Sequence, residues 1–282
     1  MSEANDKVKR YYNDNQIFYR LFWMNKKNLS MHYGYWLQGV KSRHEAMIEQ
    51  NRVVAEQLDI KSDDIVLDAG CGVGGSAIWI AENYGAKVTG ITIVEKQVRL
   101  AKRYSEERGV AGLVNFENRD FCNTGFKDNS FDKIYAIEAV CHAKSKEDFL
   151  KEMSRILKPG GKLCIMDYYL HGIPTGKGQK SYETVRSGWA LNDIPTREGF
   201  AEMLKKSKFL NIEFHDYTKE VLRSAKFMSV TAAIWLPIDL TLRFFKLISE
   251  ENLVSTKASV AQYYFFKHVA SHGLFVARKP KT

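Results

Sequence analysis

The residues of this chain that are best suited to bind a ligand gather in one glycine-rich loop. Asp68, Gly70, Gly72 and Gly74 alternate with other residues along the stretch 66–75. Glycine lets the backbone turn sharply and lets a ligand approach the main chain closely. The spacing differs from the G-x-G-x-x-G of dinucleotide folds, and the chain has no G-K-[ST] of a P-loop. The loop predicts either a nucleotide-binding corner or a glycine-rich turn of another doubly wound protein.

Alternating strands and helices surround this loop. Apolar and β-branched runs predict strands over residues 65–67, 87–92, 114–117, 131–137 and 162–168. Helical spacing and turn signals predict helices over residues 42–58, 76–81, 95–108 and 146–157. Such alternation implies a mostly parallel sheet with right-handed crossovers. Ligands of open α/β sheets bind beyond the carboxyl ends of the strands, which is where this loop lies.

Aromatic side chains are concentrated in two flanks of this region. In the first flank, residues 7–28 have apolar positions at helical spacing and residues 31–36 form an aromatic loop. This flank either packs onto the main domain or forms a lid that lines a pocket. The second flank, residues 220–271, is predicted to be mostly helical and to fold over the sheet as an aromatic-rich cap.

The remaining segments complete the predicted architecture. The polar, glycine-rich stretch 171–196 predicts a loop or insertion, and a helix over 197–207 and strands over 212–217 and 273–278 follow. We therefore expect four segments, namely an N-terminal helical arm or lid at 1–58, an α/β core at 59–219, an inserted helical cap at 220–272, and the last strand and tail at 273–282.

Composition limits the classes of partner. The 282 residues carry 42 Lys and Arg against 33 Asp and Glu, a net charge of +9. This surplus favours a phosphorylated substrate or an acidic membrane surface, and the lack of a dense basic run argues against nucleic acid. The four cysteines show no zinc-binding spacing and indicate reduced thiols in the cytoplasm.

No signal peptide or membrane span is expected. The polar start at residues 1–6 does not look like a signal peptide. The longest apolar run, residues 227–242, is shorter than a span requires and contains Pro237 and Asp239. Peripheral contact with a membrane and homo-oligomerisation are both compatible with the sequence.

Four motifs together resemble those of one family. The glycine loop is similar to motif I of the Rossmann-like, class I S-adenosylmethionine-dependent methyltransferases. Residues 131–136 resemble their fourth-strand motif, residues 157–163 the turn after the following helix, and residues 118–121 the acidic turn that meets adenine. The resemblance covers roughly residues 64–168. It implies a Rossmann-like sheet, mostly parallel with an antiparallel last strand and helices on both faces, and S-adenosylmethionine as the cofactor.

Weaker matches point to one branch of that family. Most members of the family place an acid after the second strand to bind the ribose hydroxyls. This chain has Thr92 there, followed by Gln97, which resembles the cyclopropane fatty-acid synthases and sterol C-methyltransferases. Residues 137–143, 33–36 and 273–280 also resemble sterol methyltransferase segments. The chain is shorter than typical sterol enzymes. The related prenyl-diphosphate C-methyltransferases, which use a glutamate at the position of Glu138, therefore stay open as a match.

The resemblance and the strand order together define a predicted cofactor site. Residues just after the first, second and fourth strands should face the cofactor, and two residues after the third strand should flank its adenine. The predicted cofactor-binding residues are Asp68, Gly70, Cys71, Gly72, Gly74, Thr92, Ile93, Gln97, Asp120, Phe121 and Ile137.

Methylation of an alkene would require a base and groups that stabilise a carbocation. Glu138, just after the fourth strand, is expected to serve both purposes, or else it hydrogen-bonds the cofactor or caps the next helix. For His142 we expect one of three roles, namely a second base, a group that orients Glu138, or a packed side chain. Tyr33 and Tyr35, with Trp36, supply aromatic faces or pack in the core.

The expected activity is therefore that of a C-methyltransferase acting on an isoprenoid alkene. The acceptor is predicted to be hydrophobic, either a prenyl diphosphate held by Lys and Arg of the flanks or a larger terpenoid such as a sterol. The alternatives are an O- or N-methyltransferase of a small hydrophobic metabolite, a cyclopropane synthase, and a non-catalytic binding module, against which the intact glycine loop argues. Asp128 and Asp132 lie in a surface turn and at a strand start, so no metal site is assigned.

Overall fold

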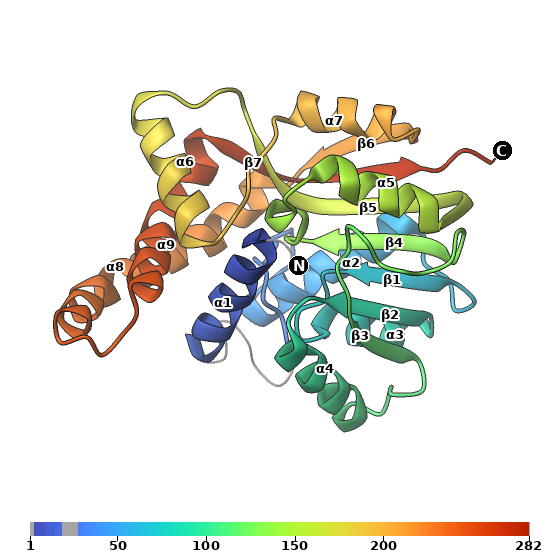
Figure 1. Cartoon of the computed structure of the whole chain (residues 1–282), viewed down its shortest axis with the longest axis horizontal. Helices are drawn as coiled ribbons and strands as arrows, with labels where there is room; N and C mark the ends of the chain where they lie inside the picture. Colours follow the sequence, from blue (N-terminus) through green and yellow to red (C-terminus); the bar gives the residue numbers. More distant parts are fainter. Residues whose placement is uncertain (1–2, 19–27, 282) are drawn as a thin grey trace.

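The computed structural model describes residues 3–18 and 28–281 and is built around a seven-stranded sheet (Figure 1). The strands are β1 (Ile65–Ala69), β2 (Lys87–Thr92), β3 (Val114–Asn118), β4 (Phe131–Ile137), β5 (Leu157–Leu170), β6 (Leu210–Asp216) and β7 (Ala270–Arg278). Their order is β3-β2-β1-β4-β5-β7-β6. Neighbours from β3 to β5 are parallel, and β7 is antiparallel to both β5 and β6. The predicted Rossmann-like sheet with an antiparallel last strand is confirmed.

Helices cover both faces of the sheet and form two hydrophobic cores. On one face lie α2 (Arg43–Leu58), α3 (Gly75–Tyr84) and α4 (Glu95–Glu107), whose buried residues share a core that includes Val54, Ile78 and Val98. On the other face lie α5 (Lys146–Ile156) and α7 (Arg197–Lys206), which pack around Phe149 and Phe200. This division holds the strands rigidly, so that the residues at their carboxyl ends are well positioned.

The predicted turn at residues 158–161 lies inside strand β5. We expected the strand to begin at Lys162, but it begins at Leu157 and shifts register opposite residues 131–133 of β4. Gly160 has a φ of +76° at this irregularity. A β-bulge of this kind lets a strand absorb extra residues without ending.

The stretch 171–196 is not simply a loop, because it contains helix α6 (Gly176–Gly188). Polar and glycine-rich composition concealed the helix, whose buried residues Ser181, Val185 and Gly188 lie at helical spacing on one face. Gly188 packs so closely on α9 (Glu250–His268) that a Cβ there would lie 2.4 Å from the Cβ of Ala258. A small residue is therefore required at this helix contact.

The second aromatic flank forms a helical hairpin of α8 (Thr218–Phe244) and α9, which projects from the sheet beside α6 (Figure 1). Pro237 lies inside α8 and does not end it. The argument that the apolar run is too short for a span does not hold, because α8 is long and apolar enough to cross a membrane by length and composition. Only 17% of its most apolar window is buried.

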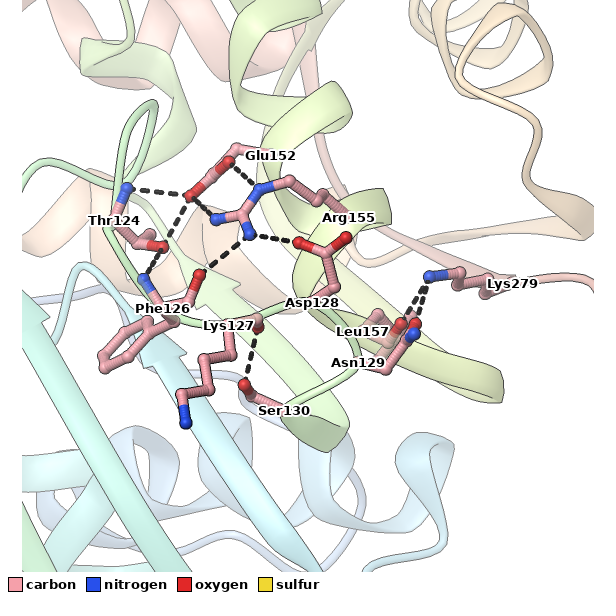
Figure 2. A network of polar contacts seen from close by, with 10 residues as sticks. All are labelled: Thr124, Phe126, Lys127, Asp128, Asn129, Ser130, Glu152, Arg155, Leu157 and Lys279. Atoms are coloured by element: carbon pink, nitrogen blue, oxygen red, sulfur yellow. Dashed lines mark hydrogen bonds and ion pairs between the residues drawn. The ribbon is translucent and has the colours of Figure 1, made fainter.

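A polar network lies beside the amino-terminal ends of β4 and β5 (Figure 2). Arg155 donates to the carbonyl of Phe126 at 2.8 Å and to Asp128 at 2.6 Å, and it also pairs with Glu152. Asp132 pairs with Lys158 at 2.8 Å. The two aspartates considered above as metal ligands thus have basic partners. In the described part of the chain, no group of three or more His, Cys, Asp or Glu residues could hold a metal ion.

Candidate active site

The glycine loop joins β1 to α3, and its glycines have two roles: some shape the loop beside the cavity, and one packs against the core. Gly70 and Gly72 have φ angles of +116° and +52°, which L side chains rarely adopt. A Cβ on Gly70 would lie 2.4 Å from that of Ala139, so this glycine allows the loops after β1 and β4 to meet. Gly74 instead caps α3, and a Cβ on it would lie 2.7 Å from the ring of Phe116. Gly74 therefore has a packing role and does not line the cavity described next.

A cavity of about 900 Å³ lies over this loop, at the carboxyl ends of β1, β2 and β4. Its lining includes every predicted cofactor-binding residue except Gly74, namely Asp68, Gly70, Cys71, Gly72, Thr92, Ile93, Gln97, Asp120, Phe121 and Ile137. The N-terminal helix α1 (Glu3–Phe18) closes the cavity with Asn5, Val8 and Tyr12. We refer to it as the cofactor cavity.

Asp68 and Asp120, two of the carboxyl groups that face the cofactor cavity, have different hydrogen-bond partners. Asp68 is 2% exposed and accepts a hydrogen bond from the Tyr135 hydroxyl at 2.9 Å. Burial raises the pKa of Asp68 to about 7, although the bond from Tyr135 lowers it. Asp120 accepts bonds from the Asn5 side chain at 2.7 Å and the Cys122 amide at 2.8 Å. Asn5 thereby ties α1 to the loop after β3.

The polar and apolar parts of this cavity fit S-adenosylmethionine. The acids Asp68 and Asp120 suit a ligand that carries positive charge, and Ile93 and Phe121 offer apolar faces to a flat base. Gly72 leaves the backbone open, since a Cβ there would come within 3.4 Å of only the Met31 sulfur.

Glu138 follows β4 and is held as a carboxylate by four donors. Its side chain is 8% exposed and its φ is +48°, a strained conformation for a non-glycine residue that is often found at functional sites. The donors are the Tyr33 amide at 3.0 Å, Gln50 Nε2 at 3.4 Å, the Tyr168 hydroxyl at 2.9 Å and His272 Nε2 at 2.9 Å. Burial raises the pKa of Glu138, but His272, His32 and the Tyr33 amide outweigh this effect and hold the pKa below its usual value.

His272 links Glu138 to the core of the protein. It is fully buried on β7, where it lies opposite Tyr168 of β5 in the antiparallel register. Opposed residues point to the same face of a sheet, so both reach Glu138 together. The other ring nitrogen of His272, Nδ1, lies 2.8 Å from the Tyr35 hydroxyl. Tyr35 is itself fully buried and stacks on Tyr217.

His142 is a neutral side chain at the cavity edge. Its Nδ1 lies 3.2 Å from the Ala190 carbonyl, which can only accept, so Nδ1 carries the proton. Nε2 then accepts the Tyr12 hydroxyl at 3.0 Å. Burial lowers the pKa of His142 to about 4, so it is uncharged at neutral pH. His142 thus fastens α1 over the site, and at neutral pH it is a weak base.

A second, larger cavity of about 1700 Å³ adjoins the first. Tyr12, Met31, Glu138 and His142 line both cavities. The second cavity is bounded by the α8–α9 hairpin and by aromatic residues, which are Tyr11, Tyr12, Tyr33, Tyr168, Trp189, Phe227 and Trp235. We refer to it as the acceptor cavity. Glu138 therefore lies at the junction of the two spaces.

The two tyrosines predicted as catalytic occupy different places. Tyr33 lines the acceptor cavity and its hydroxyl bonds to Gln262. Tyr35 lines neither cavity and acts on Glu138 only through His272. Trp36 bonds to Ser224 of α8 at 2.9 Å. The aromatic loop thus packs into the core and lines a pocket at the same time. Residues 19–27, which carry other aromatics of this flank, lie outside the described residues.

Sequence reasoning missed several residues around Glu138. The missed residues are Gln50, Tyr168, Trp189, Gln262 and His272. They come from five separate elements or loops, and none belongs to a local motif. The one available signal was alternation along the last two strands, which places residue 272 on the same face as residues 274 and 276.

Comparison with known proteins agrees with this geometry. Residues 67–165 match a family model described as a methyltransferase domain. A sterol 24-C-methyltransferase of Eremothecium gossypii is 36% identical over 60% of this chain and 44% of its own length. Cycloartenol-C-24-methyltransferase 1 of Oryza sativa subsp. japonica is 34% identical over 74% of this chain and 60% of its own length. The chain spans about half the length of the curated relatives that it matches.

Solved structures share the whole fold. The [4+2]-cyclase SpnF has a TM-score of 0.81 at 23% identity and covers 99% of this chain and 97% of its own. Geranyl diphosphate C-methyltransferase from Streptomyces coelicolor A3(2) has a TM-score of 0.74 at 19% identity, covering 99% of each chain. The chain belongs to the class I S-adenosylmethionine-dependent methyltransferases. Its sequence is similar to those of sterol 24-C-methyltransferases. Its cofactor is S-adenosylmethionine.

Proposed function

We propose that this protein methylates a carbon of an alkene in a neutral, apolar acceptor of the sterol or larger terpenoid type. The observation that carries the proposal is the position of Glu138, a buried carboxylate at the junction of the cofactor and acceptor cavities. The similarity to sterol 24-C-methyltransferases supports the same class of acceptor.

The reaction requires little covalent help from the protein. Bound S-adenosylmethionine supplies an electrophilic methyl group. The protein aligns the alkene with this group and excludes water, which is the task of α1 and the aromatic walls. The alkene electron pair would form the new carbon–carbon bond while the methyl–sulfur bond breaks and its electron pair stays on the sulfur, which would leave a carbocation on the acceptor. Glu138 then takes a proton from a neighbouring carbon, and the electrons of that C–H bond restore a double bond.

The environment of Glu138 suits both parts of this role. A carboxylate with a lowered pKa is ionised at neutral pH and can stabilise a cation in a dry cavity. A weak base is sufficient, since a proton next to a carbocation is strongly acidic. The rings of Tyr33, Tyr168 and Trp189 line the same space and can add cation–π stabilisation.

The charges of the acceptor cavity favour a neutral acceptor over a prenyl diphosphate. Among the described residues that line this cavity, Arg43 is the only Lys or Arg. Its guanidinium lies 5.2 Å from the Phe227 ring centre, and burial lowers its pKa. Diphosphates are usually held by several cationic groups or by metal ions between acids. The rest of the lining is mostly aromatic, aliphatic and hydroxyl-bearing.

The decisive experiment uses methyl-labelled S-adenosylmethionine with a panel of sterols, linear terpenoid alkenes, prenyl diphosphates, phenols and amines. We expect label in a carbon–carbon bond of a neutral alkene. Glu138→Gln should bind the cofactor normally and lose about 10²- to 10⁴-fold in kcat. The matched control, Glu106→Gln on the exposed face of α4, should turn over normally. Label in prenyl diphosphates alone, or unchanged turnover in Glu138→Gln, would contradict the proposal.

One observation favours a second candidate, methylation of an oxygen or nitrogen. The neutral His142 lines both cavities, and the partner described for its Nε2 is the Tyr12 hydroxyl of α1. A phenol or amine could take the place of that hydroxyl. Labelling of phenols or amines with no alkene product in the same panel would favour this candidate.

A further inference from the structure

Helix α8 carries an exposed apolar stripe along one face. Its members recur at helical spacing and are between 44% and 68% exposed; they are Phe227, Val230, Ile234, Ile238 and Phe245. Exposed apolar side chains are common singly, but a contiguous stripe of this kind marks an interaction surface. We call these five residues the α8 stripe.

The other side of α8 packs on the core through Val221, Ala225 and Met228 and is bonded to α9. Thr256 of α9 donates to Asp239 at 2.5 Å, and Ser229 of α8 donates to the Ser259 carbonyl at 3.1 Å. Asp239 is 6% exposed. The helix is therefore anchored along one side and offers the other side to the surroundings. Crossing a bilayer would require it to leave α9 and the core.

Basic residues flank the α8 stripe. Arg223 lies one turn before Phe227 on the same face, and Lys226 directly precedes Phe227 in the sequence. Lys246 follows Phe245, the last residue of the stripe. All three are exposed. The hairpin segment 218–268 carries seven Lys and Arg against four Asp and Glu. An apolar stripe between basic ends matches a membrane surface that contains anionic lipids.

The α8 stripe is continuous with the acceptor cavity. Phe227 belongs to both, because it lines the cavity and is 54% exposed. Trp235 also lines the cavity and is 43% exposed. The helix that would face lipid is thus a wall of the space that would hold the acceptor.

We propose that the α8 stripe docks the protein peripherally on an anionic lipid bilayer, so that a lipophilic acceptor passes from the bilayer into the acceptor cavity. This inference rests on the proposed function for the identity of the acceptor. A second copy of the chain fits the stripe less well, because pairing of two stripes about a two-fold axis would bring the basic ends of one helix against those of the other.

The test measures binding of the full chain to vesicles of phosphatidylcholine alone and of phosphatidylcholine with phosphatidylglycerol. We expect co-sedimentation that is stronger with the anionic vesicles and falls with added salt. Ile234→Ser with Phe245→Ser should bind about tenfold or more weakly, since two apolar side chains leave the lipid. The matched control is Leu210→Ser, which removes a side chain that is 54% exposed at the opposite edge of the sheet.

The outcomes separate docking from catalysis. Wild-type protein that stays unbound with both vesicle types would overturn the proposal, as would equal binding by the double variant. A dimer in light scattering that the double variant dissolves, without vesicle binding, would assign the stripe to a second copy instead. With acceptor dissolved in detergent, the double variant should keep wild-type kcat and lose turnover only on vesicle-borne acceptor. Vesicle binding without turnover on any alkene would reject the proposed function and leave the docking surface in place.

Discussion

The pKa of Glu138 depends on a histidine from the last strand. His272 donates to its carboxylate at 2.9 Å and lowers its pKa against the effect of burial. His272→Gln keeps an N–H donor but removes the imidazole, so burial should raise the pKa of Glu138. A raised pKa protonates the base at acidic pH, and the acidic limb of the kcat profile should move to higher pH.

This prediction is checked by kcat measured between pH 5 and 9 with saturating cofactor. The variant should lose more activity at the acidic end than at the basic end, with KM for the cofactor unchanged. His215→Gln, a half-buried histidine of β6 beside Glu213, provides the control. A uniform loss at every pH would mean that His272 only supports the fold.

Asp68 makes cofactor affinity depend on pH. Its pKa is raised to about 7 by burial, so below pH 7 it is mostly protonated. A positively charged ligand favours the ionised carboxylate, and binding below pH 7 must first release a proton. The Kd for S-adenosylmethionine should therefore rise by up to tenfold per pH unit as pH falls from 7 to 5, and should level off above pH 8.

Calorimetry in two buffers of different ionisation enthalpy measures this proton release directly. Asp68→Asn removes the titrating group and should bind more weakly with no such pH dependence. A pH-independent Kd in the wild type would mean that Asp68 does not titrate when the cofactor binds.

At the scale of elements, we propose that α1 acts as a lid, which two of its side-chain bonds hold over the cofactor cavity. Tyr12 bonds to His142 and Asn5 bonds to Asp120, and both α1 residues line the cofactor cavity. The bond between the neutral side chains of Tyr12 and His142 contributes about 0.5–1.5 kcal/mol, and the bond from Asn5 to the Asp120 carboxyl group adds to it. Tyr12→Phe with Asn5→Ala should therefore speed cofactor dissociation by about tenfold or more and expose Lys9 and Arg10 to trypsin.

Stopped-flow dissociation and timed proteolysis check the lid. Tyr104→Phe, on the partly buried side of α4, is the matched control. Unchanged dissociation in the double variant would mean that α1 covers the site without retaining the cofactor.

The elements that sequence predicted well are those specified locally. The strand 87–92 and the strand 131–137 have the expected bounds, because short apolar runs ended by turn residues need no distant partner. Helix α6 was missed because its stability comes from packing on α9 through Gly188 and not from its own composition. Pro237 was taken as an obstacle, yet α8 continues through it.

The residues of the candidate site also divide into those that local sequence predicts and those that depend on the tertiary fold. Ten of the eleven residues predicted to bind the cofactor line one cavity, because they follow consecutive strands and meet at the same end of the sheet. The residues that α1 and the segment 29–32 add to its lining were not predicted. The surroundings of Glu138 were not predicted either, because Gln50, Tyr168 and His272 converge from distant parts of the chain. Convergence of this kind depends on sheet order and register, which a single sequence does not contain.

At the scale of the whole molecule, the two ends of the strands have different roles: the carboxyl ends carry the candidate site, and the amino ends carry a stabilising network. Both cavities are lined by residues that follow the carboxyl ends of the strands. Helix α1 and the α8–α9 hairpin lie at the same end of the sheet (Figure 1). The opposite end carries the network of Arg155, Glu152 and Asp128 (Figure 2). We therefore expect changes in that network to lower stability without changing the affinity for the cofactor.

Arg155→Met tests this separation. Glu152 also accepts bonds from the Thr124 amide and hydroxyl at 2.8 and 2.6 Å, and without Arg155 it becomes a nearly buried carboxylate with no cationic partner among its described contacts. The expected loss is about 1–3 kcal/mol of unfolding free energy at pH 7, or a Tm lower by about 2–4 °C for each kcal/mol. Arg99→Met removes an exposed 3.7 Å pair on α4 and should cost less than about 1 kcal/mol.

The sign of the pH dependence identifies Glu152 as the cause. Burial raises the pKa of Glu152, but Arg155 and Thr124 outweigh it and hold the pKa below its usual value. A lowered pKa contributes stability above the ordinary pKa of the group, and this contribution is lost as pH falls through the folded value. The stability difference between wild type and Arg155→Met should therefore be full at pH 7 and shrink toward pH 4. A difference that is equal at both pH values would assign the loss to packing of the Arg155 stem instead of its charge.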